Sequence, residues 1–290
     1  MNDNEFVKKL SQKYGYSLEL ENYLKALLPA LITYYGEDKR EIIYNALLSC
    51  EIHIQEKGED CNKFLKQYFN RQKDINVPFL AGAFYENDIQ LKDLQVVLKS
   101  IIYIRTYDSG FDFNDERKLA ILTHEICHAI KGYKKLEITP DGLINSTGLI
   151  KEYYQLDKST NEFVEVKSDN TGLEEGLNSY DEKQIMTIMT GKPFEGVTYP
   201  ILVQIIEFLD KIPNLLEVIK TSQFTGNNEW MDFLGPEQAQ FLATNMEKVY
   251  LPFVSDLSNE KKFIKLRDDM DKAADNLVQF VENYEPTIKK

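Results

Sequence analysis

Residues Ile121–Ile130 have the sequence ILTHEICHAI, and this stretch predicts a buried helix. Asn114 is a good N-cap, acidic residues follow it in the first turn, and Gly132 is suited to end the helix. At about 100° per residue, the apolar side chains fall within a sector of about 80°. These side chains belong to Leu119, Leu122, Ile126 and Ile130. His124 and His128 fall on the opposite side, so the helix can pack on a core while both imidazoles face away.

The spacing of the two histidines is the one that a zinc site on a helix needs. Side chains four residues apart lie on the same side of a helix, so both rings can reach one ion. Glu125 is displaced by one residue, where it ligates poorly but can hold a water molecule and accept its proton. Two ordinary buried histidines are the alternative interpretation. The helical periodicity, the cap and the uncharged residues around the motif agree with one another and favour zinc.

The composition resembles that of an ordinary soluble protein and disfavours several classes of function. The chain has 290 residues, 43% hydrophobic and 28% charged, with a net charge of −13 and no long basic run. This charge disfavours nucleic acid and anionic membranes as partners. The sequence contains no apolar stretch of about 20 residues and no signal-peptide core. Three scattered cysteines are too few for a disulfide scaffold, so we expect a cytoplasmic protein, with a non-classical export route as the alternative.

The pattern of hydrophobic residues predicts an α+β fold in three consecutive regions. Residues 1–75 form an N-terminal helical region, with breaks near Pro29 and Gly36 and a third, short helix at Asp60–Phe69. Residues 76–195 form a central core, and residues 196–290 form a C-terminal helical region. In the core we expect strands near 80–86, 93–98 and 100–107, an Asn87-Asp88 turn, the histidine helix, and a β-meander with turns at Pro140-Asp141-Gly142 and Lys158–Asn161.

The last predicted helix, about 259–284, carries apolar residues at alternating spacings of three and four. We expect this stripe to pack on its own domain, and a dimeric coiled coil is the alternative. Its members are Phe263, Leu266, Met270, Ala273, Leu277, Phe280 and Tyr284.

At ILTHEICHAI the sequence resembles the zincin metallopeptidases. The longer metzincin pattern needs a glycine three residues past the second histidine and a histidine three further on. This chain has Lys131 and Lys134 at those positions, which excludes that branch. The third histidine, His53, stands far upstream in CEIHIQ, and we interpret it as an ordinary helix residue. The third metal ligand is therefore expected to be a carboxylate downstream.

Two adjacent glutamates, Glu174 and Glu175, are the candidates for that ligand. Thr171-Gly172-Leu173-Glu174 fits a capping box, which would use Glu174 at the start of a helix. That helix is predicted to run to about Thr190, and Glu175 falls about 180° from its apolar stripe. The stripe consists of Leu173, Leu177, Tyr180 and Ile188. This geometry favours Glu175, and Glu174 stays open if the helix begins a residue or two later.

The segment LEEGLNSY also resembles the second-ligand helix of the gluzincins, especially the NEG form of the aminopeptidase branch. This resemblance makes Glu175, directly before Gly176, the zinc ligand. The thermolysin-like form carries a supporting aspartate four residues after the ligand, where this chain has Ser179. Asn178 and Glu182 lie on the same side of the helix as Glu175 and are candidates to support the site, with solvated polar side chains as the alternative.

Residues that would contact a substrate are less well defined. AGAFYEN resembles the gluzincin edge strand that hydrogen-bonds an extended substrate, and Glu86 is a candidate for the glutamate that holds a substrate amine. An ordinary strand is the alternative. A tyrosine is the natural donor to an oxyanion, because no downstream histidine remains. Tyr180 is predicted to point away from the site, and Tyr199 is one choice among 17 tyrosines.

Together, the residues and the resemblance imply a zincin-like core, with a small, mostly antiparallel sheet and an active-site helix, flanked by helical regions. The expected function is a zinc metallopeptidase with one Zn²⁺ bound by His124, His128 and Glu175, and with Glu125 as general base, acting on peptides or proteins. A narrow-specificity regulatory or toxin-like protease and a zinc-binding protein with vestigial activity stay open. The intact Glu125 argues against the second alternative, because a structural zinc site needs no base.

Overall fold

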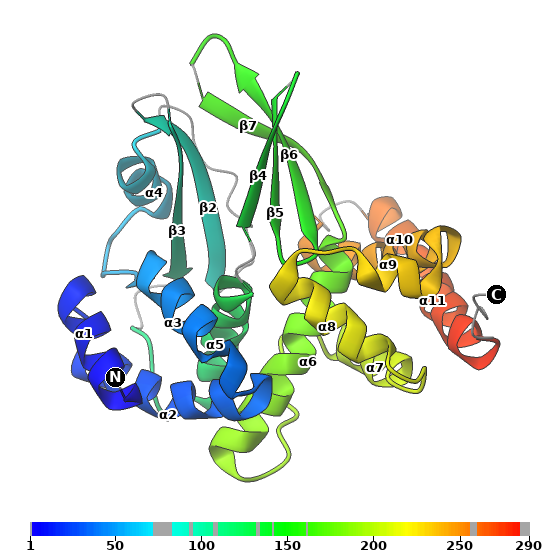
Figure 1. Ribbon diagram of the computed structural model, residues 1–290, viewed down its shortest axis with the longest axis horizontal. Helices are drawn as coiled ribbons and strands as arrows, with labels where there is room; N and C mark the ends of the chain where they lie inside the picture. Colours follow the sequence, from blue (N-terminus) through cyan, green and yellow to red (C-terminus); the bar gives the residue numbers. More distant parts are fainter. Residues whose placement is uncertain are drawn as a thin grey trace. The chain divides into compact units, whose positions relative to one another are not determined.

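Helices make up most of the described chain, and two small sheets accompany them (Figure 1). The computed structural model describes residues 2–71, 83–92, 95–106, 110–131, 134–140, 142–160, 162–255 and 260–284. Within these ranges the predicted α+β class is confirmed. The helices are α1 (Asp3–Tyr14), α2 (Leu18–Tyr35), the 3-10 turn η1 (Glu37–Lys39), α3 (Arg40–Ser49), α4 (Cys61–Phe69), α5 (Glu116–Ile130), α6 (Thr171–Thr190), α7 (Pro200–Leu209), α8 (Leu215–Thr225), α9 (Glu229–Leu234), α10 (Pro236–Val254) and α11 (Glu260–Glu282).

The strands form one mixed sheet and one meander. They are β1 (Cys50–Ile54), β2 (Ala83–Lys92), β3 (Gln95–Ile104), β4 (Lys134–Thr139), β5 (Gly142–Thr147), β6 (Ile150–Asp157) and β7 (Glu162–Asp169). The first sheet has the order β1-β3-β2, with β1 parallel and β2 antiparallel to β3. The second sheet has the chain order β4-β5-β6-β7, with β5 antiparallel to β4 and β6, so the predicted meander is confirmed.

The chain divides into two compact units, and neither is continuous in sequence. Unit 1 consists of Met1–Gly132, Leu156–Phe163 and Asp181–Thr198. Unit 2 consists of Tyr133–Gln155, Val164–Tyr180 and Tyr199–Lys290. Helix α6 belongs to both units, because the boundary falls between Tyr180 and Asp181. The predicted division into 1–75, 76–195 and 196–290 stays a prediction.

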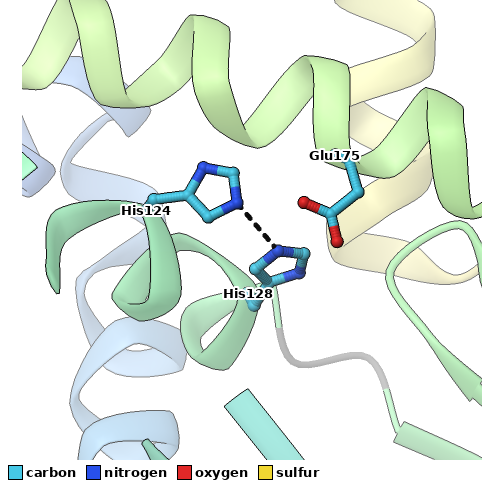
Figure 2. A group of neighbouring side chains, drawn as sticks. All are labelled: His124, His128 and Glu175. Carbon is cyan, nitrogen blue, oxygen red and sulfur yellow. Dashed lines mark hydrogen bonds between the residues drawn. The ribbon is translucent and has the colours of Figure 1, made fainter. Parts of the chain in front are cut away.

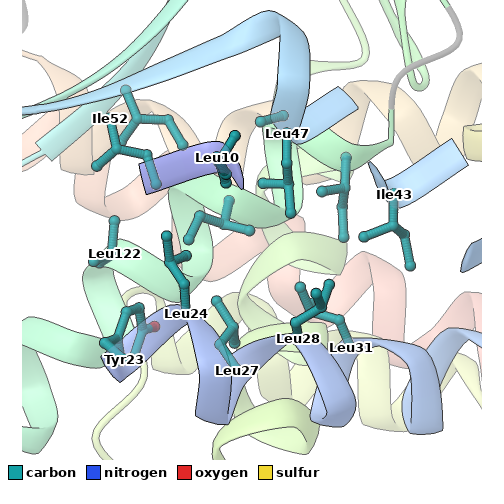
Figure 3. Packing of buried hydrophobic residues seen from close by; sticks show 14 of the residues in the cluster. Leu10, Tyr23, Leu24, Leu27, Leu28, Leu31, Ile43, Leu47, Ile52 and Leu122 are labelled. Atoms are coloured by element: carbon teal, nitrogen blue, oxygen red, sulfur yellow. The ribbon is translucent and has the colours of Figure 1, made fainter. Parts of the chain in front are cut away.

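The core of unit 1 is built by helices α1, α2, α3 and α5 together with strands of the three-stranded sheet (Figure 3). Helix α1 begins at a capping box, in which Asn2 and Glu5 each accept the other's backbone N–H. Helix α2 begins at Ser17, whose hydroxyl accepts the N–H of Leu20. The shared core consists of fully buried aliphatic residues, among them Leu10, Leu24, Leu27, Leu31, Ile43, Leu47 and Leu122. Burial of this apolar surface holds the motif helix α5 in place.

Two expectations for the N-terminal region are wrong. Helix α2 runs through Pro29 to Tyr35, although a break was expected there. The buried leucines on both sides of Pro29 outweigh the hydrogen bond that proline cannot make. Residues Cys50–Ile54 were expected to be helical, but they form β1, because parallel pairing with β3 supplies partners that local sequence does not reveal. The predicted third helix is α4, and its N-cap is Asp60.

The strands before α5 are also shifted from the prediction. Asn87 and Asp88 lie inside β2, opposite Ser100 and Lys99, so they do not form a turn. Parts of the predicted strands, turns and helix end lie outside the described residues, namely 80–82, 93–94, Tyr107, Gly132, Asp141 and Asn161.

Unit 2 packs α6, α7, α10 and α11 around a second apolar cluster. Helix α11 contributes Ala273 and Leu277, each 1% exposed, and its partly buried Met270 and Phe280 pack on the same cluster. The expectation that this stripe packs on its own domain is confirmed for these positions, while Phe263 stays 38% exposed. Among the described helices, none combines the length and the apolarity needed to span a bilayer.

The apolar stripe of α6 changes direction along the helix. Leu173 and Leu177 are fully buried in the core of unit 2, and Tyr180 packs partly against it. Ile188, which was expected to continue the stripe, is 41% exposed. In the second half of the helix, Ile185 is instead buried in the core of unit 1. The prediction for Ile188 is wrong because the two halves of α6 belong to different cores.

Candidate metal centre

Helix α5 carries the two histidines and is buried along its second half. Its N-cap is Asp115, whose carboxylate accepts the N–H groups of Arg117 and Lys118. The expected cap Asn114 is therefore wrong by one residue. The helix ends at Ile130, with Lys131 as C-cap. All residues from Leu122 to Ile130 are buried, so both faces of the helix are covered.

The two imidazoles face each other through their Nε2 atoms. The Nε2 atoms of His124 and His128 lie 3.2 Å apart, and the ring planes are inclined by 72° (Figure 2). Two nitrogen ligands at about 2.0–2.1 Å from a tetrahedral zinc ion are about 3.3 Å apart. The separation of the two ring nitrogens therefore matches the spacing of two ligands of one ion.

Glu175 is the carboxylate that groups with the histidines. It lies on α6, and its carboxylate points towards the two rings (Figure 2). One ligand atom from each of His124, His128 and Glu175 lies within 4.8 Å of the others. Two imidazoles and one carboxylate are donors that zinc accepts at catalytic sites, with a fourth position left for water or substrate. The donor set and its spacing thus fit a zinc ion.

Glu182 lies two turns beyond Glu175 on the same helix and contacts the outer nitrogen of His124. Its Oε2 atom is 3.2 Å from His124 Nδ1, and both side chains are buried. The backbone N–H of Thr198 donates to the same carboxylate, at 3.1 Å from Oε1. A proton on Nδ1 that is donated to Glu182 leaves the Nε2 lone pair of His124 free for a metal. This contact is the arrangement that orients histidine ligands in metal sites.

The other residues expected near Glu175 are also buried. Asn178 and Ser179 are both 0% exposed, so neither is a solvated polar side chain. On the helix, Asn178 stands between Glu175 and Glu182, one turn from each. Its burial is compatible with the predicted supporting position, although its role stays a prediction.

Glu174 has a structural contact that differs from the predicted one. Its Oε2 atom accepts the N–H of Leu149, at 3.0 Å, in the turn between β5 and β6. The predicted capping partner, Thr171, is instead 3.2 Å from Ser168 through its hydroxyl. The side chain of Glu174 is 1% exposed and covers Gly148, where a Cβ would lie 2.7 Å from its Oε1 atom. Glu174 is thus directed to the meander, while Glu175 is grouped with the histidines.

Glu125, the expected base, follows His124 on α5 and is 8% exposed. Helical spacing turns its side chain by about 100° from that of His124. It is absent from the ligand group, which agrees with a role other than ligation.

The tyrosines near α6 separate into two environments. Tyr180 packs against the core of unit 2, with Lys220 Nζ 4.7 Å from its ring centre. Tyr199 packs edge-to-face on Tyr250, with ring centroids 5.6 Å apart. Burial raises the pKa of Tyr250 above its ordinary value, and the negative charge of Glu175 raises it further. Tyr250 could not be predicted from the sequence, because nothing in its local pattern links α10 to α6.

Two other candidates lie elsewhere in unit 1. His53 is on β1, where its Nε2 atom is 2.9 Å from Glu59, and its ring stacks on Phe64. The expectation that His53 is no ligand agrees with this environment, although the expected helix is wrong. Glu86 lies in β2, at an edge of the described three-stranded sheet, opposite Ile101. Its predicted role toward a substrate amine stays a prediction.

A buried ion pair near the two histidines was not predicted from the sequence. Lys131, three residues after His128, is 0% exposed and lies 2.6 Å from Asp181. The only local signal was a lysine directly after a helix whose last five residues, Ile126–Ile130, are uncharged apart from His128.

Comparisons with protein families, with curated proteins and with solved structures found no significant match to this chain.

Proposed function

We propose that this protein is a zinc-dependent metallopeptidase of the gluzincin type, which hydrolyses peptide bonds in peptide or protein substrates. The observation that carries the proposal is the convergence of His124, His128 and Glu175 within 4.8 Å. When bound at these residues, zinc would lower the pKa of a coordinated water molecule and polarise a substrate carbonyl.

Glu125 performs the proton transfers in this proposal. Its carboxylate accepts the proton of the attacking water and then delivers it to the departing amine. Helix α5 supports this role, because it fixes Glu125 next to a ligand but outside the ligand group. The small exposure of Glu125 also limits competition from bulk water.

Glu182 supports the ligand His124 rather than the substrate. Its contact with Nδ1 holds the imidazole in the tautomer whose Nε2 atom can bind a cation. The resemblance to gluzincins predicts an acidic partner four residues after the glutamate ligand, where this chain has Ser179. In this proposal Glu182, seven residues after Glu175 and on the same side of the helix, takes over the supporting role.

We also propose that the protein works in a reducing compartment such as the cytoplasm. Its three cysteines, Cys50, Cys61 and Cys127, are all free thiols. Assays for metal and activity are therefore best run with a reductant that does not bind zinc.

The test uses wild-type protein and the variant Glu125→Gln, which keeps the shape of the side chain but cannot accept a proton. We expect about one zinc per chain in both proteins, measured by elemental analysis. We expect peptidase activity on a mixed peptide library only in the wild type, with turnover in the variant lower by about 10²- to 10⁴-fold. Absence of zinc after reconstitution would overturn the site. Zinc binding without any turnover would indicate a metal-binding protein and would contradict the proposed peptidase activity.

A further inference from the structure

The buried ion pair of Lys131 and Asp181 links the end of helix α5 to the middle of helix α6. Lys131 follows the histidine helix α5, and Asp181 lies on α6 directly before Glu182. Lys131 Nζ is 2.6 Å from Asp181 Oδ2, and both side chains are 0% exposed. Both residues belong to unit 1, so the contact lies within one compact unit.

The Asp181 carboxylate is also held by α2. The hydroxyl of Tyr34 donates to Oδ1 at 2.5 Å, and the hydroxyl of Tyr35 donates to Oδ2 at 2.8 Å. Burial raises the pKa of the Tyr35 hydroxyl, and the nearby Asp181 charge raises it further, so the phenol stays a donor. One carboxylate therefore joins α2, α6 and the end of α5.

Such a pair needs an explanation other than stability. Removing two charges from water costs about as much as their attraction returns, and buried ion pairs can often be replaced by apolar residues without loss of stability. Their best-attested use is to select one register among alternatives that an apolar interface would tolerate. An apolar interface between α5 and α6 would not by itself fix the position of α6 along its axis.

The register of α6 decides what reaches the histidines. Glu182 is next to Asp181, and Glu175 stands six residues earlier on the same continuous helix. A slide of α6 by one residue moves each side chain by about 1.5 Å along the axis and about 100° around it. That change would remove Glu182 from His124 and turn Glu175 away from the ligand group.

We propose that the Lys131–Asp181 pair, with Tyr34 and Tyr35, is a positioning device that sets α6 in register with α5 and thereby assembles the metal centre. This inference rests on the proposed metal site but not on peptidase activity. Lys131 stands where the metzincin pattern requires a glycine, and in this proposal it positions helix α6.

The main test replaces the entire polar cluster with apolar residues. The variant Lys131→Met, Asp181→Leu, Tyr34→Phe, Tyr35→Phe removes both members of each of the three contacts to Asp181, so a folded protein is expected. The matched control is Lys192→Met, which breaks the exposed 3.0 Å ion pair between Lys192 and Glu116. Zinc affinity is measured by competition with a chromogenic chelator, ligand geometry by the visible spectrum of the Co²⁺ form, and folding by the melting temperature of the metal-free protein.

We expect the apolar variant to bind zinc about 10- to 100-fold more weakly, as for other residues that orient metal ligands, and to show an altered Co²⁺ spectrum. The control should retain both properties of the wild type. A folded apolar variant with wild-type affinity and spectrum would overturn the proposal and leave the pair a packing feature.

If the apolar variant fails to fold, Asp181→Glu provides the second test. It keeps the charge and lengthens the link by one methylene, so it should weaken zinc binding and change the Co²⁺ spectrum. Unchanged affinity and spectrum in this folded variant would refute the positioning role. A wild-type protein that binds no zinc would overturn the proposed function as well, which separates the two failures.

Discussion

Replacing each of the adjacent glutamates with alanine separates a structural carboxylate from a metal ligand. Glu174→Ala removes the acceptor of the buried Leu149 N–H, a 3.0 Å hydrogen bond. A buried N–H without a partner costs about 1–3 kcal/mol. In a chain of this size, 1 kcal/mol lowers the melting temperature by about 2–4 °C, so we expect a decrease of about 2–12 °C. The zinc content of this variant should stay at one per chain.

Glu175→Ala should instead lower the zinc content, because it leaves only two histidine ligands. Zinc at about 100 times its dissociation constant stabilises the wild type by about 2.7 kcal/mol, and this variant should lose most of that gain. Differential scanning calorimetry with and without zinc measures both effects, and elemental analysis gives the stoichiometry. Glu174→Gln is the control, since its amide oxygen can still accept the Leu149 N–H. Loss of zinc from the Glu174 variant, with zinc retained in the Glu175 variant, would refute the assignment.

Three further predictions concern other parts of the molecule. Gly148→Ala should destabilise the protein by about 1–3 kcal/mol, because φ is +60° at this position and the new Cβ would lie 2.7 Å from the Glu174 carboxylate. Urea unfolding measures this change, and an unchanged midpoint of the unfolding curve would contradict the prediction. Burial raises the pKa of both Cys61 and Cys127, that of Cys127 to about 12, but Cys61 is partly exposed and Cys127 is buried. Iodoacetamide at pH 8 should therefore modify Cys61 but not Cys127 in native protein, as mass spectrometry can check against a denatured control. Burial also raises the pKa of Glu247, so the folded state binds the carboxyl proton more tightly than the unfolded state does. The protonated Glu247 therefore contributes fully to stability below about pH 4.5, and this contribution declines as the pH rises through the folded pKa. The metal-free variant Glu247→Gln should lack this decline.

Features that depend on local spacing could be predicted from the sequence. The i, i+4 histidines, the meander and the position of Glu175 opposite Leu173 and Leu177 follow from helical and strand periodicity alone. Glu175 is also the carboxylate that groups with the histidines in the structure. The general position of α4 could be anticipated because its cap, Asp60, is adjacent in sequence.

Features that depend on distant partners could not be predicted. Residues Cys50–Ile54 become a strand because β3, about 50 residues later, offers a parallel edge. Glu174 bonds Leu149, which is 25 residues earlier and across a strand turn, so its local capping pattern was misleading. Lys131 is charged and stands at a helix end, where solvent exposure is the usual outcome. Only the position of Asp181 in three dimensions explains its burial.

The discontinuity of the two units has a consequence for how the chain folds. Unit 1 needs Asp181–Thr198, so during synthesis residues 1–132 cannot complete it until α6 has left the ribosome. Until then, Lys131 lacks its carboxylate partner, and burying it alone would leave an uncompensated charge. Many native contacts also join residues distant in sequence, which slows folding. Nascent chains arrested before residue 181 should therefore remain protease-sensitive along α5, and protection should appear in one late step after α6 emerges.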